Sequence, residues 1–447
     1  MKGLPDDDPR SFTQQANVHC AYCNGAYDQV GFPVEVQVHN SWHFFPFHRY
    51  YLYFHEKIMG ELIGDPTFAL PFWNYDAPEG MRMPAIYADD KSSLYDELRN
   101  DNHLPPTLVD LDYGGVEPTI DDEAQIRSNL RVMYRQMVSN SRTPSLFLGS
   151  AYRAGDEPSP GGGSVENIPH GPVHVWCGDN EQPNFENMGN FYSAARDPIF
   201  FAHHANIDRL WSVWKTLGGR RQDLQTPDWL NASFIFYDEK AQAVRVTVRD
   251  CLDSKNLGYV YQDVQIPWLQ TRPTPRQTLR SQRAVARSSN IPFFGAGPAL
   301  AGETGPSSSR VRPARIKFPV TLNSVVSTEV KRPRKSRSKK EKEEEEEILV
   351  ISGIEFDANE AIKFDVLIND EDDREILADN TEFAGSFVNV PHKHGHKKKV
   401  KTGLRLGITE LLQDLEAEGD DAVRVTLVPR LGRGLVTIAG INIEFDK

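Results

Sequence analysis

Apolar residues recur with helical spacing in several stretches of the first half of the chain. These stretches are residues 34–60, 126–138 and 197–217. Apolar positions three or four residues apart are typical of helices that bury one face. Further along, residues 234–237 and 244–249 alternate between apolar and polar side chains, as half-buried strands do. The pattern therefore predicts a mainly helical region followed by a pair of strands.

The C-terminal quarter of the chain has a different period. Short apolar segments with alternating side chains lie at residues 348–351, 361–368, 383–390, 423–428 and 441–445. Several short strands at such intervals, with one helix near residues 408–417, are typical of a small β-sandwich.

Two stretches between these regions lack an apolar period. Residues 271–312 are rich in Arg, Pro, Ser and Gly, which predicts a linker. Residues 331–347 carry a basic run followed by an acidic run, and the two charges largely cancel. We interpret this second stretch as a solvated loop rather than as a nuclear signal or a basic binding patch.

The predicted fold class is therefore α+β and multidomain. A mainly α-helical core domain occupies residues 1–270, the linker follows at 271–312, and a C-terminal β-sandwich domain occupies 313–447 and includes the charged loop. A chain of 447 residues is too long for one ordinary hydrophobic core, so more than one domain is expected.

Composition and charge exclude several classes of function. The net charge of -13 argues against nucleic acid as a partner, because phosphate binding needs an excess of Lys and Arg. No apolar run is long enough for a membrane span. The first residues carry no apolar signal core, so we expect no targeting peptide in this chain. The chemistry of the protein is therefore sought in its histidines and cysteines.

Histidines are concentrated in two helical patterns of the core. His170 and His174 lie at positions i and i+4, which places both imidazoles on one face of a helix. The pattern at 197–217 adds His203 and His204, of which only one is expected to face the same site, because neighbouring helix residues point about 100° apart. Three neutral imidazoles without a nearby thiolate or carboxylate favour copper or zinc over iron.

A second group of three histidines is predicted near the N-terminus. His19, His39 and His48 are spaced for such a cluster, and His48 begins an aromatic segment that indicates a buried helix. Two three-histidine centres without the carboxylate motif of di-iron proteins indicate a paired copper site. A zinc hydrolase is disfavoured, because no general-base carboxylate lies in a motif such as His-Glu-x-x-His.

The remaining histidines and cysteines receive less specific interpretations. We expect three of them, His43, His55 and His103, to be ordinary core or surface residues. We interpret the segment with His392, His394 and His396 as a charged loop, with adventitious metal binding as the alternative. Cys20 and Cys23 form a Cys-x-x-Cys pair that fits a redox dithiol or half of a zinc site, but no βαβ pattern surrounds it.

Several of these motifs together resemble the plant polyphenol oxidases, the catechol oxidase and tyrosinase group of type-3 copper proteins. The matching segments include residues 19–27, 39–49, 71–76, 167–176 and 197–211. Further landmarks are Asp228-Trp229-Leu230, the pair Tyr259 and Tyr261, and Lys363-Phe364-Asp365-Val366. The resemblance covers the chain from about residue 14 to its C-terminus.

The resemblance implies a four-helix bundle that holds two copper ions. By position, the implied ligands of the first copper are His19, His39 and His48, and those of the second are His170, His174 and His204. Cys23 matches the cysteine that forms a thioether bond to the middle histidine of the first site, here His39. Phe191 matches a bulky aromatic residue over the second copper. Glu166 matches an acidic residue that holds an ordered water.

The implied activity is oxidation of o-diphenols to o-quinones with reduction of O2 to water at the type-3 binuclear centre. Gly171 occupies a position where monophenol-hydroxylating relatives often have Asn, so diphenol oxidation is favoured. Additional tyrosinase-type monophenol hydroxylation, an oxygen-binding protein without turnover, and an inactive truncated homologue are the alternatives. The expected partners are a small phenol and O2, together with an activating protease.

The resemblance also implies latency and a location. The C-terminal domain matches one that shields the copper site, so a cut between about 271 and 345 is expected to raise activity. Relatives carry an N-terminal segment whose cysteines form disulfides, one of them to the residue that matches Cys20, and this chain lacks that segment. By resemblance, the location is the plastid, in the thylakoid lumen.

Overall fold

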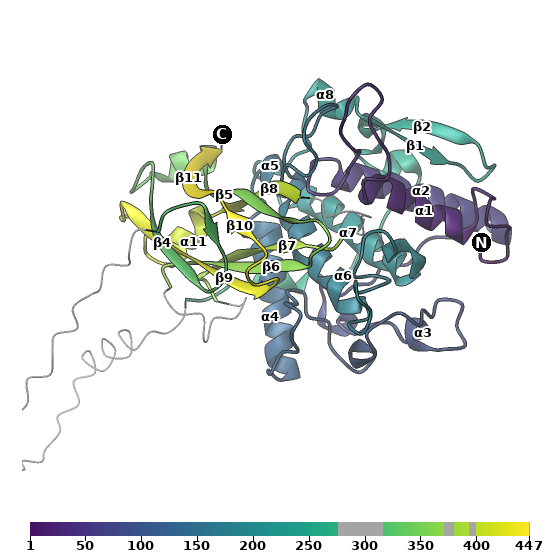
Figure 1. Cartoon of the computed structure of the whole chain (residues 1–447), viewed down its shortest axis with the longest axis horizontal. Helices are drawn as coiled ribbons and strands as arrows, with labels where there is room; N and C mark the ends of the chain where they lie inside the picture. The colour runs from purple at the N-terminus through teal and green to yellow at the C-terminus, as the bar shows by residue number, and fades with distance from the viewer. Residues whose placement is uncertain (276–315, 371–379, 393–398, 447) are drawn as a thin grey trace, which may run out of the picture.

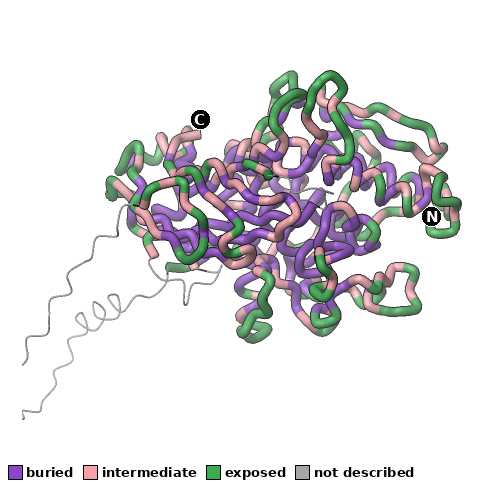
Figure 2. The backbone as a smooth tube through the Cα atoms, in the orientation of Figure 1, coloured by how far each residue is buried: buried purple, intermediate pink, exposed green. Residues whose placement is uncertain are grey.

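The computed structural model describes residues 1–275, 316–370, 380–392 and 399–446. It consists of a mainly helical region and a β-rich region that pack side by side (Figure 1). Both regions have a buried core, and buried segments of the two regions meet at their boundary (Figure 2). The predicted fold class, a helical core followed by a β-sandwich, is confirmed.

Four helices form the centre of the helical region. They are α1 (Phe12–Cys23), α2 (Phe44–Ile63), α6 (Gly171–Cys177) and α7 (Ile199–Thr216). Every residue of α6 is buried, and thirteen residues of α2 are buried. α2, α6 and α7 therefore contact protein around most of their circumference, which is typical of helices at the centre of a domain, whereas α1 buries one face that includes His19.

The helix predicted over residues 34–60 begins later than the apolar spacing indicates. The Ser41 hydroxyl donates to the carbonyl of Val38, and the His43 backbone N–H donates to that hydroxyl. These local bonds hold residues 38–43 in a turn, because a short polar side chain competes with the helical hydrogen bonds. This turn places His39 beside the helices, although His39 itself does not belong to a helix.

Shorter elements surround the four central helices. They are α3 (Ala85–Ala88), α4 (Asp122–Tyr134) with the π-helical turn η3 (Arg135–Ser139), α5 (Pro144–Leu148), α8 (Pro227–Leu230), and the hairpin of β1 (Ser233–Tyr237) and β2 (Ala243–Thr247). The hairpin confirms the predicted pair of strands. Among the helices of the described ranges, none is long and apolar enough to cross a bilayer.

Two antiparallel sheets form the C-terminal region. One has the order β11-β5-β10-β3 with β8 also paired to β5, and the other has the order β4-β9-β6-β7. The strands are β3 (Val320–Thr321), β4 (Val326–Lys331), β5 (Glu346–Asp357), β6 (Ile362–Ile368), β7 (Phe383–Asn389), β8 (Lys399–Gly407), β9 (Ala422–Leu431), β10 (Thr437–Ile438) and β11 (Gly440–Asp446). A short helix, α11 (Thr409–Asp414), follows β8. Apolar residues from both sheets share one core, as in a sandwich.

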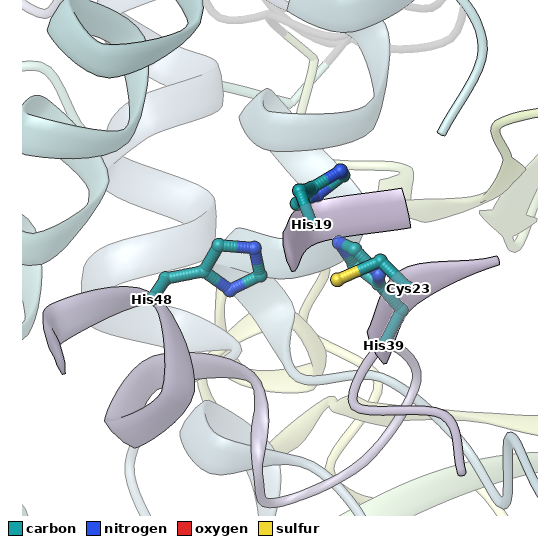
Figure 3. A group of neighbouring side chains, drawn as sticks. All are labelled: His19, Cys23, His39 and His48. Carbon is teal, nitrogen blue, oxygen red and sulfur yellow. The ribbon is translucent and has the colours of Figure 1, made fainter. Parts of the chain in front are cut away.

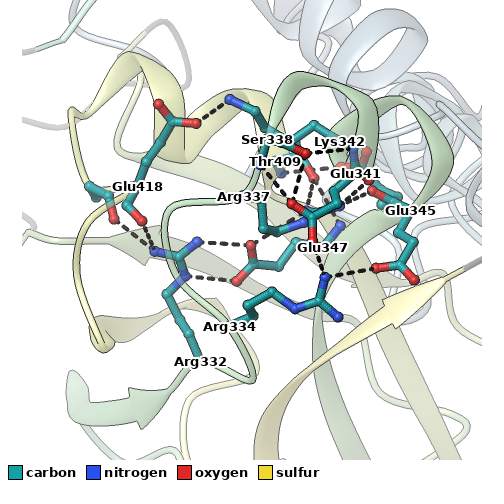
Figure 4. Close-up of polar contacts among 12 residues, drawn as sticks. Arg332, Arg334, Arg337, Ser338, Glu341, Lys342, Glu345, Glu347, Thr409 and Glu418 are labelled. Carbon is teal, nitrogen blue, oxygen red and sulfur yellow. Dashed lines mark hydrogen bonds and ion pairs between the residues drawn. The ribbon is translucent and has the colours of Figure 1, made fainter.

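The charged run at 331–347 is largely exposed, as expected of a solvated segment, but it is not a loop throughout, because part of it forms a helix (Figure 4). The helix α10 (Lys339–Glu344) spans the change from the basic to the acidic run and begins with a capping box formed by Ser338 and Glu341. Arg332 forms a buried ion pair with Glu347, at 2.7 and 2.9 Å. The two signs of charge pair with each other locally, and these pairs hold the segment against the sandwich.

A buried ion network joins the two regions. The Lys363 ammonium group in β6 lies 3.1 Å from Asp112 of the helical region and 2.9 Å from Asp365. Arg430 contacts the second Asp365 oxygen at 2.5 Å. Burial acts to lower the pKa of Lys363, but the surrounding carboxylates raise it overall. Removing one member of such a buried pair leaves an uncompensated charge, so Lys363 is important for docking of the β-sandwich.

Candidate metal centre

Three histidines and one cysteine converge in the first half of the helical region (Figure 3). His19 lies in α1, His39 in the turn before α2, and His48 in the first turns of α2. Cys23, at the end of α1, lies beside His39. One potential ligand atom of each residue lies within 4.8 Å of those of the other three. The predicted first group of histidines is therefore assembled in space.

A second group is formed by His170, His174, His203 and His204. His170 ends the π-helical turn η4 (Glu166–His170), and His174 lies one turn later in α6, as the spacing predicted. The other two lie next to each other in α7. Their potential ligand atoms also lie within 4.8 Å of one another.

Backbone carbonyls hold four of the imidazoles in one orientation. In each of these residues the Nδ1–H donates to a carbonyl oxygen, since a carbonyl can only accept a hydrogen bond. The pairs are His19 with Phe191 at 3.1 Å, His48 with Phe44 at 2.8 Å, His170 with Glu166 at 3.1 Å, and His174 with Met188 at 2.7 Å. The Nε2 atoms of these rings therefore carry no proton and present a lone pair, as metal-binding histidines do.

Burial keeps these imidazoles neutral. It lowers the pKa of His48 to about 3 and that of His174 to about 4, and it lowers the pKa of His19, His39 and His170 well below the usual value. A neutral imidazole is the form that binds a metal ion. No proton needs to be displaced from these rings when a metal ion binds near neutral pH.

The two groups face each other. The rings of His48 and His204 are stacked with centroids 4.4 Å apart, and those of His39 and His170 are 5.5 Å apart. The Nε2 atoms of His19, His48 and His170 are buried without a hydrogen-bond partner. Unsatisfied buried nitrogens are costly, and here they point into a shared space. This donor set fits a pair of copper ions.

The structure places both members of the histidine doublet in the second group, but in different positions. The Nε2 atom of His204 lies 3.1 Å from that of His174, and the His204 ring also stacks on His48 of the first group. The His203 ring also contacts His170 and His174, with centroids 5.5 and 5.0 Å apart, but its further neighbour is Tyr75 at 5.6 Å rather than a ring of the first group. His204 thus lies between the two groups and His203 lies to one side of them.

Two further predicted site residues lie against the histidines. Glu166 is buried, and its Oε1 accepts a hydrogen bond of 2.5 Å from the Asn40 backbone N–H. Its Oε2 has no hydrogen-bond partner within the described part of the chain, and burial raises the pKa of this carboxyl to about 8. The Phe191 ring stacks on His39 at 3.9 Å and is 6.2 Å from the ring of His170, so it lies between the two groups rather than over the second alone.

Sequence reasoning missed the residues that cover this centre. The Phe191 N–H donates to the carbonyl of Pro391, and the Phe191 ring packs against the edge of His392 at 4.7 Å. Val388 and Val390, at the end of β7, also belong to the helical core. Gly171, next to the proposed ligand His170, also faces this strand, because a Cβ atom there would lie 2.9 Å from Val388 Cγ1. The C-terminal region therefore closes the centre.

The interpretation of His392 as part of a charged loop was wrong. Its side chain is buried, while His394 and His396 lie outside the described residues. The burial of β7 explains the error, because all seven residues of this strand are buried. Its sequence, Phe-Ala-Gly-Ser-Phe-Val-Asn, lacks charged residues on either face. That pattern was the available signal that both faces are covered.

Three other histidines have the structural roles expected of them. His43 contacts the Tyr152 carbonyl through its ring at 3.0 Å, and the His55 ring stacks on Phe201 at 3.6 Å. His103 stacks on Trp176 at 4.3 Å. All four cysteines are free thiols in the structure.

Known families match most of the chain. Residues 9–217 match the common central domain of tyrosinase, residues 223–274 match the polyphenol oxidase middle domain, and residues 318–445 match the chloroplastic polyphenol oxidase C-terminal domain.

Individual relatives match along the whole chain. A chloroplastic polyphenol oxidase of Malus domestica is 65% identical over 447 residues, which is 100% of this chain and 73% of the relative. The chloroplastic catechol oxidase B of Solanum tuberosum is 47% identical over 453 residues, with 100% and 73% covered. Latent apple tyrosinase has a similar structure, with a TM-score of 0.89 at 62% identity and with 100% of this chain and 92% of that chain covered. Latent aurone synthase gives 0.87 at 44% identity, with 99% and 84% covered.

Proposed function

The chain belongs to the plant polyphenol oxidase family of type-3 copper proteins, and we propose that it oxidises o-diphenols to o-quinones with O2. The supporting observation is the pair of buried histidine groups, in which backbone carbonyls orient the rings so that unprotonated Nε2 atoms face a common space. Two copper ions held there would supply the reversible one-electron chemistry that couples phenol oxidation to O2 reduction.

The position of each ring supports the proposed ligand assignment. His19, His39 and His48 would hold one copper ion, and His170, His174 and His204 would hold the other. His204 is preferred to His203 because its ring lies between the two groups. The carbonyl acceptors on the Nδ1 side keep the rings from rotating when the metal changes oxidation state.

The other residues of the centre would control access and hydration. Phe191 provides an apolar wall on which a phenol ring can pack, and this wall excludes water from the reacting atoms. The Oε2 atom of Glu166, which has no hydrogen-bond partner among the described residues, is suited to hold an ordered water. Gly171 has no side chain that could hold the same water from the other side, which favours diphenols over monophenols as substrates.

The enzyme would be latent as long as the C-terminal region covers the centre, and cleavage by a protease would activate it. The contacts of Phe191 with Pro391 and His392 support this proposal. Because the named relatives are chloroplastic, we propose a plastid location for this protein, within the thylakoid lumen.

Oxygen uptake distinguishes the candidate activities. Copper-loaded protein, freed of its C-terminal region, should consume O2 with catechol and form quinone, and it should do so with tyramine far more slowly or only after a lag. Equal initial rates with both phenols would indicate an enzyme with full monophenol hydroxylation, as the name tyrosinase indicates for the apple relative. Reversible O2 binding without quinone, or no bound copper, would contradict the proposal.

Replacing Gly171 by alanine should weaken latency. A Cβ atom at this position would lie 2.9 Å from Val388 Cγ1, so the added methyl group pushes against β7 and strains the closed form by about 1–3 kcal/mol. The activity of the uncleaved chain should rise, while the cleaved enzyme should change little. The double variant Gly171→Ala, Val388→Ala restores the space and should restore latency; failure to do so would refute steric exclusion as the cause.

Cys23 and His39 are the proposed partners of a thioether bond. His39 is the one proposed ligand of the first group whose ring nitrogens have no hydrogen-bond partner among the described residues, so no hydrogen bond fixes its ring. Mass spectrometry of protein that has been exposed to copper and O2 should show a cross-linked peptide lighter by two hydrogens, and the Cys23→Ala variant should lack it. An unlinked pair of peptides in active enzyme would contradict this assignment.

A further inference from the structure

A continuous series of aromatic side chains leads from the second histidine group to the surface. The ring of Tyr75 lies 5.6 Å from that of His203, and the Trp73 ring lies 5.4 Å from Tyr75. Trp73 is 6.2 Å from Trp176, which follows His174 by two residues in α6. All these rings are buried, and each is in contact distance of the next.

The series continues through His103 to a tyrosine beside a carboxylate. The His103 ring stacks on Trp176 at 4.3 Å with an interplanar angle of 5°, and it meets the edge of Tyr113 at 5.2 Å. The Tyr113 hydroxyl donates to Glu117 Oε1 at 3.2 Å, and His103 Nε2 lies 3.0 Å from the same oxygen. The Glu117 side chain is 52% exposed, so the series ends in contact with solvent.

We propose that these rings carry single oxidising equivalents away from the copper centre when no phenol is bound, with Tyr113 as the terminal electron donor and Glu117 as its proton acceptor. Tyr and Trp are among the side chains that lose an electron most readily. Electron transfer slows steeply with distance, so several short steps are faster than one long step. The proposal rests on the proposed function, because O2 at the copper centre is the oxidant.

The electrons and protons balance at each end of the series. One electron moves from Tyr113 to the centre across four side chains, namely His103, Trp176, Trp73 and Tyr75. At the centre it reduces O2, so that no electron is taken from a ligand imidazole. The phenolic proton of Tyr113 moves to Glu117, which leaves a neutral tyrosyl radical. A catechol at the surface then gives one electron to the radical, and Tyr113 takes its proton back from Glu117. The catechol loses one proton to water and becomes a semiquinone.

The position of Glu117 distinguishes Tyr113 from an ordinary core tyrosine. Loss of an electron from a phenol is far easier when its proton can leave at the same time. Burial and the neighbouring Glu117 raise the pKa of Tyr113, so the hydroxyl keeps its proton until the electron leaves. The half-exposed carboxylate can exchange the accepted proton with solvent.

The test exposes copper-loaded enzyme to hydrogen peroxide without a phenol. Electron paramagnetic resonance on rapidly frozen samples detects a tyrosyl radical, and peptide mass spectrometry measures oxygen added to the histidine peptides of the centre. The native chain should give the radical and little added oxygen. Tyr113→Phe should abolish the radical and increase oxidation of the histidine peptides several-fold.

Two further variants separate electron transfer from a structural role. Glu117→Gln keeps an acceptor for the Tyr113 hydroxyl but cannot take its proton, so it should also lose the radical. Tyr134→Phe is the matched control, because Tyr134 is a buried tyrosine beside the carboxylate of Glu410 with a pKa raised to about 12, and it should behave like the native chain.

Each result bears on the proposal separately from the enzymatic activity. An unchanged radical and unchanged histidine oxidation in Tyr113→Phe would overturn it, even if all variants oxidise catechol normally. Loss of the radical in Tyr134→Phe as well would show that the signal does not report on this series. A native chain that binds no copper would instead refute the proposed function.

Discussion

Replacement of His204 by alanine should leave the protein with one copper ion instead of two and lower catechol oxidation roughly a thousandfold or more. The Nε2 atom of His204 lies 3.1 Å from that of His174, and its ring stacks on His48 at 4.4 Å. Without this imidazole, the second site keeps only His170 and His174 as its proposed ligands. Copper content by elemental analysis and O2 uptake on the cleaved enzyme measure the two effects.

The neighbouring histidine is the matched control. His203 has the same burial and lies on the same helix, but it contacts His170 and Tyr75 rather than the first group. His203→Ala should therefore retain two copper ions and lose activity by about 100-fold at most, as changes around a metal ligand do. Loss of copper from His203→Ala, with retention in His204→Ala, would reverse the assignment.

Cleavage of the chain between residues 271 and 345, for example at a site in 276–315, should raise the oxidase activity once the C-terminal region has dissociated. In the closed form Pro391 and His392 pack on Phe191, beside the proposed copper ligands, and so cover the approach of a phenol to the centre. If the open form is populated at between about 0.1 and 10%, its complete release raises the rate roughly 10- to 1000-fold. O2 uptake with catechol before and after cleavage is the measurement, and equal turnover would contradict the shielding role.

The ion network between the two regions supplies a sharper version of this experiment. Lys363→Met leaves Asp112 and Asp365 without their shared cation, which should weaken docking by about 3–5 kcal/mol, so the cut chain should separate and gain activity more readily. Lys399→Met is the control, because Lys399 lies in the same sandwich, is 81% exposed and pairs only at the surface with Glu355. This control should release no faster than the native chain.

Much of the helical region could be predicted from local patterns. The interval between His170 and His174 is a property of any helix, so the two rings had to share a face wherever the helix packed. The start of α2 could not be predicted in the same way. The apolar spacing continues back to residue 34, but the side-chain bonds of Ser41 override it and form the turn that positions His39.

The charged run and His392 show a different limit of sequence reasoning. Charges are usually solvated, and that expectation led to the prediction of loops at both places. In the structure, Arg332 and Glu347 satisfy each other inside the fold, and His392 is buried by contact with a distant segment that includes Phe191. Whether a polar residue is buried depends on partners that are far away in the sequence, and a local pattern contains no information about them.

By itself, the sequence determined which side chains carry the chemistry, because imidazoles at helical spacing and recurring motifs are local features. Only the tertiary structure decided how those side chains are used. It oriented the His19 imidazole through the carbonyl of Phe191, separated His204 from His203 by their contacts with the first group, and placed β7 over the centre. These features depend on packing between segments that are far apart in the sequence, where geometry in three dimensions, rather than residue type, sets the contacts.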